Sequence, residues 1–240
     1  MNRLMRAIKT DVIVQFRNGL YHVGLGVGII TAIIISQLIG IEAMSLAMAG
    51  IMILVVGAST VLYVAAMILF EQDEGTIYAT LISPLTHGEY LAAKITSLAI
   101  LASLEAMTMF YGAILIMYFQ AVDIILPNFF ILTLSLLTIC VIFVLMGIIL
   151  VVRHKKITDF IMPMAGLMLI LSLPILYFIG ISDHWLWLIF PISPPTMLML
   201  GAFDGLENWQ YIYGIGYSLL LLIGLSIWAQ KAFAKHIVGA

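Results

Sequence analysis

Long apolar runs, separated by short polar segments, dominate this chain. Several runs reach the roughly 20 consecutive apolar residues that a helix needs to cross the hydrocarbon core of a bilayer. They lack the period-two alternation that is typical of a membrane β-barrel. We therefore predict an all-α, polytopic membrane protein that forms one transmembrane domain over residues 1–240. Six transmembrane helices are expected at 20–40, 44–70, 91–119, 124–152, 159–181 and 210–230.

Composition supports this class. Hydrophobic residues make up 64% of the 240 residues and charged residues 9%, whereas roughly one quarter of a soluble domain is charged. A full-length span follows a basic amphipathic start, so we expect no cleaved signal peptide. Cys140, the only cysteine, lies inside the predicted fourth span, and we expect it to serve packing.

The basic residues predict the orientation of the spans. In the six-span arrangement all ten fall on one side: Arg3, Arg6, Lys9, Arg17, Lys94, Arg153, Lys155, Lys156, Lys231 and Lys235. Because cytoplasmic loops carry the excess of Lys and Arg, this side is expected to face the cytoplasm, with both termini. The run 153–156 needs no further role, although it could also bind anionic lipid or a partner protein.

The first 19 residues predict an amphipathic helix that lies flat on the membrane. Four apolar residues share one stripe: Leu4, Ile8, Val12 and Phe16. Basic residues occupy the other side, so the helix suits anionic lipid. Two roles stay open, a simple topology anchor and a mechanical role in holding a partner.

The region before the last span is rich in proline and tryptophan. Thr158 and Asp159 are expected to start the fifth span, Pro163 follows in its first turn or so, and Pro174 is expected to kink it. Residues 182–209 are too short and too interrupted by proline to span the bilayer, and their tryptophans suit the headgroup region. We predict an extracytoplasmic, re-entrant or interfacial pair of short helices here.

A polar interruption, "EQDEGTIYATLISPLTHGEYLAAK" from Glu71 to Lys94, separates the second and third spans. Acids precede a moderately apolar segment that ends at Pro84, which predicts a short cytoplasmic helix within residues 71–90. Thr86 and Glu89 have the spacing of a capping box that starts the next span. Acids and a proline turn could also simply join two helices, but the length and apolar middle favour a docking helix.

This loop resembles that of type-2 ABC transporter permeases, in which an acid, "EGT", a "LISPLT" break, "EY" and a Lys follow one another. The outline of the whole chain is similar to that family. The opening "RLMRAIKTDVIVQFRNGLYHV" also resembles permeases assigned to fluoroquinolone and related drug export. The resemblance implies a coupling helix that docks on an ATPase subunit. Its transmission surface would comprise Glu71, Glu74, Gly75, Thr76, Leu81, Pro84 and Glu89.

The chain contains no phosphate-binding loop of the type G-x-x-x-x-G-K-[ST], so we expect no ATP hydrolysis and no cofactor in this chain. The resemblance implies a separate ATP-binding subunit that holds ATP and Mg²⁺. It also implies a second permease chain, identical or a sister, in a bacterial or archaeal cytoplasmic membrane. Membrane lipid is a further partner, and we expect no nucleic-acid partner and no metal site.

Glu105 is the acid that the sequence places deepest in the bilayer. It follows Lys94 by eleven positions, about 16 Å along a helix. Acids at this depth usually face a bundle interior or an aqueous cavity. Three roles stay open: contact with a cationic substrate, a protonated acid hydrogen-bonded to a neighbouring helix, and proton coupling. Further candidates for the substrate path are Ser59, Thr60, Tyr63 and Met109, although polar groups between helices often only hold them together.

These features favour the membrane subunit of an ATP-driven exporter. The 15 Met residues and 11% aromatic residues suit an adaptable path for an amphipathic or drug-like cargo. One alternative is a proton-coupled secondary carrier that uses Glu105, although the sequence shows no repeated halves. Another is an ATPase-independent membrane enzyme that uses Glu105 or Asp159, although no second carboxylate or metal-ligand set accompanies them.

Overall fold

The computed structural model describes residues 3–38, 44–76, 86–120 and 126–239, and within these ranges it is helical and contains no strand. Six stretches are long and apolar enough to cross a membrane: Leu20–Gln37, Ala47–Asp73, His87–Phe119, Phe129–Val151, Ile157–Phe178 and Asn208–Ile237. The prediction of an all-α protein with six transmembrane helices is therefore confirmed.

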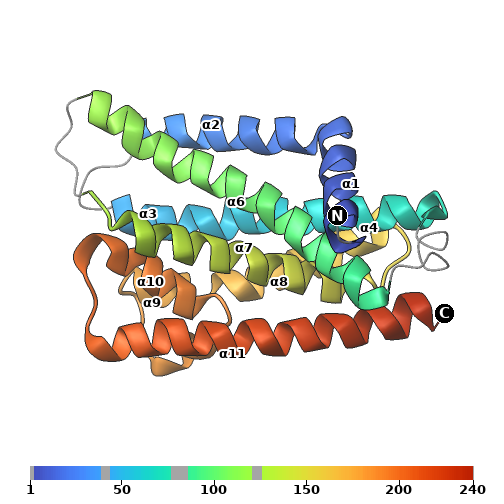
Figure 1. Cartoon of the computed structure of the whole chain (residues 1–240). Helices are drawn as coiled ribbons and strands as arrows, with labels where there is room; N and C mark the ends of the chain where they lie inside the picture. The colour runs from blue at the N-terminus through green and yellow to red at the C-terminus, as the bar shows by residue number, and fades with distance from the viewer. Residues whose placement is uncertain (1–2, 39–43, 77–85, 121–125, 240) are drawn as a thin grey trace.

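The long helices lie side by side, and α1 crosses their ends (Figure 1). The α-helices are α1 (Arg3–Arg17), α2 (Leu20–Leu38), α3 (Met44–Ile51), α4 (Gly57–Asp73), α6 (His87–Phe119), α7 (Phe129–Val151), α8 (Ile157–Ser172), α9 (Ile175–Phe178), α10 (Ser193–Asp204) and α11 (Asn208–Phe233). The end of α11 lies at the same end of the bundle as α1 (Figure 1), which we call the α1 end.

Helix α7 lies at the centre of the core because it is apolar on every side. It packs against α4, α6, α10 and α11. Glycines allow the closest approach between α4 and α7. An ideal Cβ on Gly57 would lie only 2.5 Å from Phe143 Cζ, and one on Gly147 would lie 3.2 Å from Val64 Cβ. Small residues of this kind let membrane helices gain van der Waals contact that lipid cannot replace.

Helix α2 packs mainly against α6 through three small residues spaced by four, Gly24, Gly28 and Ala32. An ideal Cβ on Gly28 would lie 3.0 Å from the carbonyl oxygen of Glu105. One on Gly112 would lie 3.1 Å from Ala32 Cβ. The α2–α6 interface therefore depends on close backbone approach, as in other small-xxx-small helix pairs.

The second span is a composite. Helix α3 continues through a π-helical segment, Met52–Val56, into α4 without a turn. Side chains of Met52, Ile53 and Val56 are buried there. The extra residue in a π turn changes the direction in which all earlier side chains point.

Several predicted boundaries require correction. The third span begins at His87 rather than 91 because the predicted Thr86–Glu89 capping box forms. The fifth begins at Ile157, so Thr158 does not cap it. Pro174 interrupts the helix inside this span: α8 ends at Ser172 and the chain resumes as the single turn α9, still within the candidate span Ile157–Phe178. The last span runs from Asn208 to Phe233 and continues as a π-helical segment, Ala234–Val238.

The predicted re-entrant segment 182–209 contains a 3₁₀-helix, Trp185–Ile189, and α10. Two tyrosines of α11 hold the 3₁₀-helix: Tyr213 Oη donates to Leu188 O at 2.5 Å and Tyr217 Oη to Ile189 O at 2.7 Å. Helix α10 packs on α3, α7 and α11 at the end of the bundle opposite α1. The position of this segment relative to the membrane stays a prediction.

Candidate functional site

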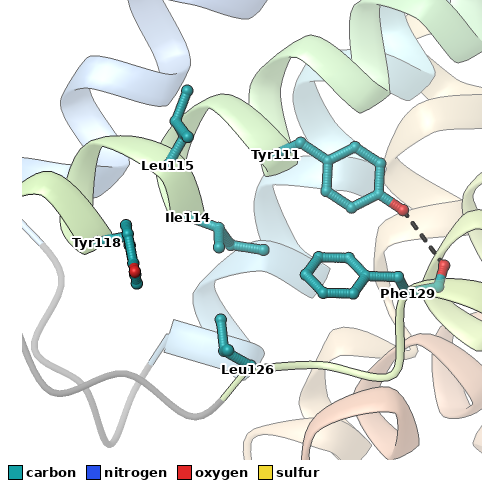
Figure 2. Close-up of a pocket in the computed structure, with 6 residues that line it drawn as sticks. All are labelled: Tyr111, Ile114, Leu115, Tyr118, Leu126 and Phe129. Atoms are coloured by element: carbon teal, nitrogen blue, oxygen red, sulfur yellow. Dashed lines mark hydrogen bonds between the residues drawn. The ribbon is translucent and has the colours of Figure 1, made fainter.

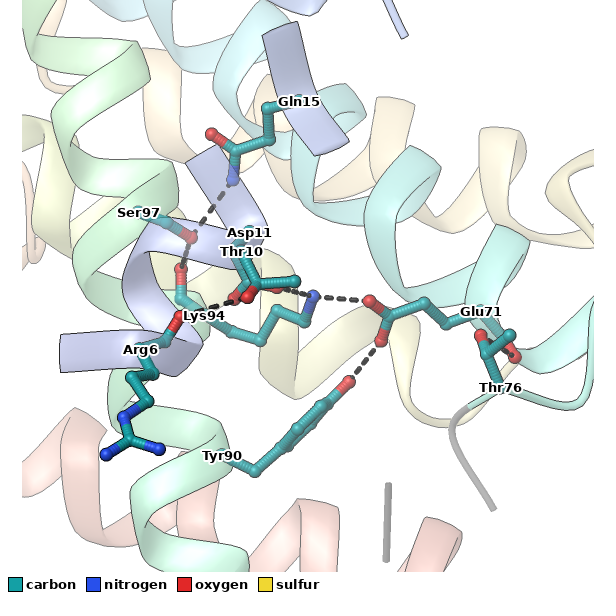
Figure 3. Close-up of polar contacts among 9 residues, drawn as sticks. All are labelled: Arg6, Thr10, Asp11, Gln15, Glu71, Thr76, Tyr90, Lys94 and Ser97. Atoms are coloured by element: carbon teal, nitrogen blue, oxygen red, sulfur yellow. Dashed lines mark hydrogen bonds and ion pairs between the residues drawn. The ribbon is translucent and has the colours of Figure 1, made fainter. Parts of the chain in front are cut away.

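A buried lysine joins three helices at the α1 end. Lys94 of α6 is 1% exposed and donates to Asp11 Oδ1 of α1 at 2.6 Å. Its Nζ also contacts Glu71 Oε1 near the end of α4, so one ammonium group bridges two carboxylates (Figure 3). Because removal of Lys94 would leave two partly buried carboxylates without a cation, this ion triad strongly specifies how the three helices meet.

Tyr90 extends the triad toward the C-terminal end of α11. Its hydroxyl donates to Glu71 Oε2 at 2.5 Å, and its ring centroid lies 5.5 Å from Lys94 Nζ. The ring also packs on Phe233, with 5.3 Å between the centroids. A change in the position of Glu71 would therefore act on α1, α6 and α11 together.

The face of α1 that packs on α6 carries polar side chains. The fully buried Gln15 donates from Nε2 to Ser97 Oγ at 3.0 Å, and Ser97 Oγ in turn donates to Lys94 O at 3.2 Å. By contrast, Phe16 of the predicted apolar stripe is 56% exposed. The other three residues of the stripe, Leu4, Ile8 and Val12, are partly buried, and Val12 packs against the core. At about 100° per residue Asp11 and Gln15 lie on the same face of the helix as these three, so this face of α1 packs on the bundle.

Burial raises the pKa of the Asp11 carboxyl above its ordinary value, although Lys94 opposes this shift. The direction shows that loss of water around Asp11 outweighs the attraction of a single ammonium shared with Glu71. The attraction of Lys94 is what opposes this rise. The triad is therefore sensitive to any movement that separates α1 from α6.

The segment after Glu71 leaves the bundle at this point. Helix α4 ends at Asp73, and Gly75 adopts φ +69°, a left-handed conformation that suits glycine after a helix end. Glu74, Gly75 and Thr76 are exposed, whereas the side chain of Glu71 is 21% exposed and turned toward Lys94. The predicted transmission residues Leu81 and Pro84 lie outside the described residues.

A cavity of about 380 Å³ opens beside the triad. Its lining comes from α1, the end of α4 and the start of α6: Ala7, Thr10, Asp11, Val14, Glu71, Glu74, Thr76, Tyr90 and Ala93. Of the predicted transmission residues, Glu71, Glu74 and Thr76 meet here, while Glu89 caps α6 through Thr86. The walls of this cavity include three acids, Asp11, Glu71 and Glu74.

Glu105 lies at the middle of α6 and is fully buried. Ser59 Oγ of α4 donates to Glu105 Oε1 at 2.9 Å. An ideal Cβ on Gly24 of α2 would lie 3.1 Å from Tyr63 Oη and 3.5 Å from Glu105 Oε2. The predicted path residues Glu105, Ser59 and Tyr63 are therefore together, enclosed by α2.

The two remaining path candidates are also buried. Thr60 and Met109 are both 0% exposed, and the Thr60 hydroxyl has no hydrogen-bond partner within the described residues. Met109 follows Glu105 by one helical turn on α6. Both side chains are therefore enclosed within the helix bundle.

An apolar pocket of about 390 Å³ opens at the far end of α6 from Lys94. Side chains of α6, the connection before α7 and the first residue of α7 line it (Figure 2): Tyr111, Ile114, Leu115, Tyr118, Leu126 and Phe129. Tyr111 Oη contacts Phe129 O at 3.3 Å and Thr133 Oγ1 at 2.5 Å. Aromatic rings with few polar groups suit a flat, apolar ligand.

Helix α6 therefore contributes Lys94 to the triad, carries Glu105 and forms most of the apolar pocket. Sequence patterns identified Glu71 and Glu105 but not Asp11, Gln15 or Ser97. Tyr90 and Lys94 appeared only as the "EY" and the Lys of the loop motif, and Lys94 also as a marker of orientation and depth. The available signal was spacing: Asp11 and Gln15 are four apart on α1, and Tyr90, Lys94 and Ser97 are four and three apart on α6. That spacing places each set on one helix face but does not say that the two faces meet.

Comparison with known proteins agrees with this membrane architecture. The family model described as the fluoroquinolones export permease protein family matches residues 2–240. Two relatives from two strains of Mycobacterium tuberculosis, both named fluoroquinolones export permease protein, are 24% identical to the chain. Each alignment covers 99% of this chain and 98% of the relative. The chain is a multi-pass membrane protein that belongs to the fluoroquinolones export permease protein family.

Proposed function

We propose that this chain is the membrane-spanning permease subunit of an ATP-driven ABC exporter, and that a separate ATPase subunit supplies the energy. The observation that carries the proposal is the ion triad that couples α1, α4 and α6 next to the exposed segment Glu74–Gly75–Thr76. An ATPase that moves this segment would act directly on the triad. Family membership and the resemblance of the loop to type-2 ABC permeases support the assignment.

The proposed orientation places the α1 end in the cytoplasm. All ten Lys and Arg residues fall in elements or connections at that end. The positive-inside rule then assigns α10 and the 3₁₀-helix to the outer side. An ATPase can reach only the cytoplasmic side, so the position of the cavity beside the triad at the α1 end fits this orientation.

We propose that Glu74, Gly75 and Thr76 contact the ATPase, together with Leu81 and Pro84, while Glu71 passes the motion inward. Glu71 already binds Lys94 and Tyr90, so displacement of α4's end must either carry α6 along or break a buried ion pair. Breaking it is costly. Rigid-body tilting of α6 is the cheaper response, and this is a common form of switching.

The proposed cargo is an amphipathic, drug-like compound. The relatives are named for fluoroquinolone export, and compounds with flat aromatic rings fit the ring-lined pocket at the outer end of α6. Tilting α6 would change both this pocket and the covering of Glu105 by α2. The chain thus has a polar site midway along the same helix that could attract a cationic part of the cargo.

Charge reversal at the exposed loop tests the proposal. In vesicles that hold the permease and its co-purified ATPase, Glu74→Lys should lower drug transport about tenfold if a single contact of about 1.4 kcal/mol is lost. ATP hydrolysis should continue because this chain does not perform it. The matched control is Asp183→Lys, an exposed acid at the opposite end of the bundle. Unchanged transport by Glu74→Lys at normal membrane levels would remove the coupling role.

The isosteric change Glu105→Gln tests the cargo site. Gln keeps the shape and can still accept the hydrogen bond from Ser59, but it carries no charge. Export of a cationic cargo should fall about tenfold, while a neutral cargo of similar size is unaffected, because charge attraction is strong in a low-dielectric interior. Ser59→Ala is the control that removes the hydrogen bond and keeps the acid. Equal export of both cargos by Glu105→Gln would leave this acid a purely structural role.

A further inference from the structure

A second polar cavity, of about 290 Å³, lies at the α1 end away from the triad. The last turn of α4, the α7–α8 connection and the π-helical end of the chain form its walls. Its lining residues are Gln72, Asp73, Val152, Arg153, His154, Lys155, His236 and Ile237. None of these residues takes part in the proposed coupling site.

Two basic side chains that line the cavity form no ion pair within the described residues. Arg153 and Lys155 are exposed, and within the described ranges neither has an acid within ion-pair distance. Asp73 also lines the cavity, so with both histidines neutral the walls carry two positive charges and one negative charge, a net charge of +1. His154 is fixed by its Nδ1, which lies 3.0 Å from Leu150 O.

An unpaired buried donor provides an independent indication of a ligand. Gln72 Nε2 is shielded from solvent and has no hydrogen-bond acceptor among the described residues. A buried amide donor without an acceptor costs free energy, so native proteins usually satisfy it. Gln72, Arg153 and Lys155 come from different segments but line one concave site, where an anion with several oxygens would accept from all of them.

We propose that this cavity binds the phosphate of an anionic lipid headgroup. It lies where two spans end, at Asp73 and Val151, which is the level of headgroups if these spans cross the bilayer. Val152 and Ile237 add apolar walls that suit the start of a lipid's glycerol and acyl region. Basic pockets between helices on the cytoplasmic side are suited to such headgroups. Free phosphate shares the same chemistry, and the experiment separates the two sources.

The test uses the full-length protein in phosphatidylcholine nanodiscs to which phosphatidylglycerol is added in steps, with melting temperature as the readout of binding. Since each basic residue contributes about 1 kcal/mol at a lipid surface, Arg153→Gln with Lys155→Gln should weaken the apparent affinity for phosphatidylglycerol about thirtyfold. Gln72→Leu should also weaken it, although the net charge is unchanged. A parallel titration with inorganic phosphate shows whether a soluble anion occupies the cavity instead.

Lys156→Gln is the matched control, because Lys156 is an exposed neighbour that does not line the cavity. A clearly larger loss for Arg153→Gln than for Lys156→Gln, with a loss for Gln72→Leu, supports the site. Equal losses for the two charge variants and none for Gln72→Leu would overturn it in favour of general attraction to the surface. Stabilisation by inorganic phosphate alone would overturn the lipid and assign the cavity to a soluble anion. The melting temperature in pure phosphatidylcholine confirms that each variant folds.

Discussion

Replacing Lys94 by Met is expected to be the most damaging single change in this chain. The substitution leaves Asp11 and Glu71 facing each other without the ammonium that both of them bind. Removing one member of a buried ion pair typically costs 3–5 kcal/mol, and about 3 kcal/mol is expected here because both acids retain some exposure. Melting curves of the purified protein measure this loss, and transport should fall with it.

Replacing all three charged residues of the triad is expected to restore the stability that Lys94→Met loses. The triple variant Asp11→Asn, Glu71→Gln, Lys94→Met carries no buried charge at this point, so it should regain most of the lost melting temperature. Transport should not return, because the neutral contacts hold α1, α4 and α6 together less firmly. Lys231→Met, a change at an exposed lysine of α11, is the control. A triple variant as unstable as Lys94→Met would show that the ion triad does not determine stability.

Gly28→Leu is expected to separate α2 from α6. Even a Cβ at this position would lie 3.0 Å from Glu105 O and 3.1 Å from Thr108 Cβ, so a Leu side chain cannot fit without moving the helix. Overpacking of this kind typically costs about 1–3 kcal/mol. The measurement is disulfide formation between cysteines introduced at Ala32 and Gly112 in a Cys140→Ala background, which should form readily in the parent and poorly in Gly28→Leu.

Gly26 supplies the matched control two positions earlier on the same helix. An ideal Cβ there meets nothing within 4 Å, so Gly26→Leu should leave cross-linking and melting temperature close to those of the parent. The contrast separates a steric effect at the interface from a general effect of Leu on helix α2. Equal cross-linking in Gly28→Leu and Gly26→Leu would contradict the close packing of α2 and α6.

The spans could be predicted from the sequence because the bilayer imposes a simple requirement of length and apolarity. The capping box at Thr86 and Glu89 could be predicted as well, since it depends on residues only three apart. Pro174 shows the limit of such local reasoning: proline disfavours the helix before it, but its position alone does not say whether the helix bends or is interrupted, as it is after Ser172.

The triad could not be predicted, because its members are far apart in the chain. Asp11 and Lys94 are separated by 83 positions and meet only when α1 packs across the start of α6. The position of Lys94 at the cytoplasmic end of a predicted span is already explained by the positive-inside rule. Nothing in the sequence therefore indicates that it is buried between two acids. The role of Gly24 and Gly28 could not be predicted for a related reason. A small residue indicates close helix packing only when the helix that packs against it is known.

The π-helical segment Met52–Val56 is the point at which the second span could change its register. In an α-helix each residue advances the side-chain direction by about 100°, so conversion of this segment to α-helix would rotate one half of the span against the other by about that angle. Ser59 lies just beyond the segment and holds Glu105. Such a rotation would move Ser59 relative to α6 and so separate its hydroxyl from Glu105.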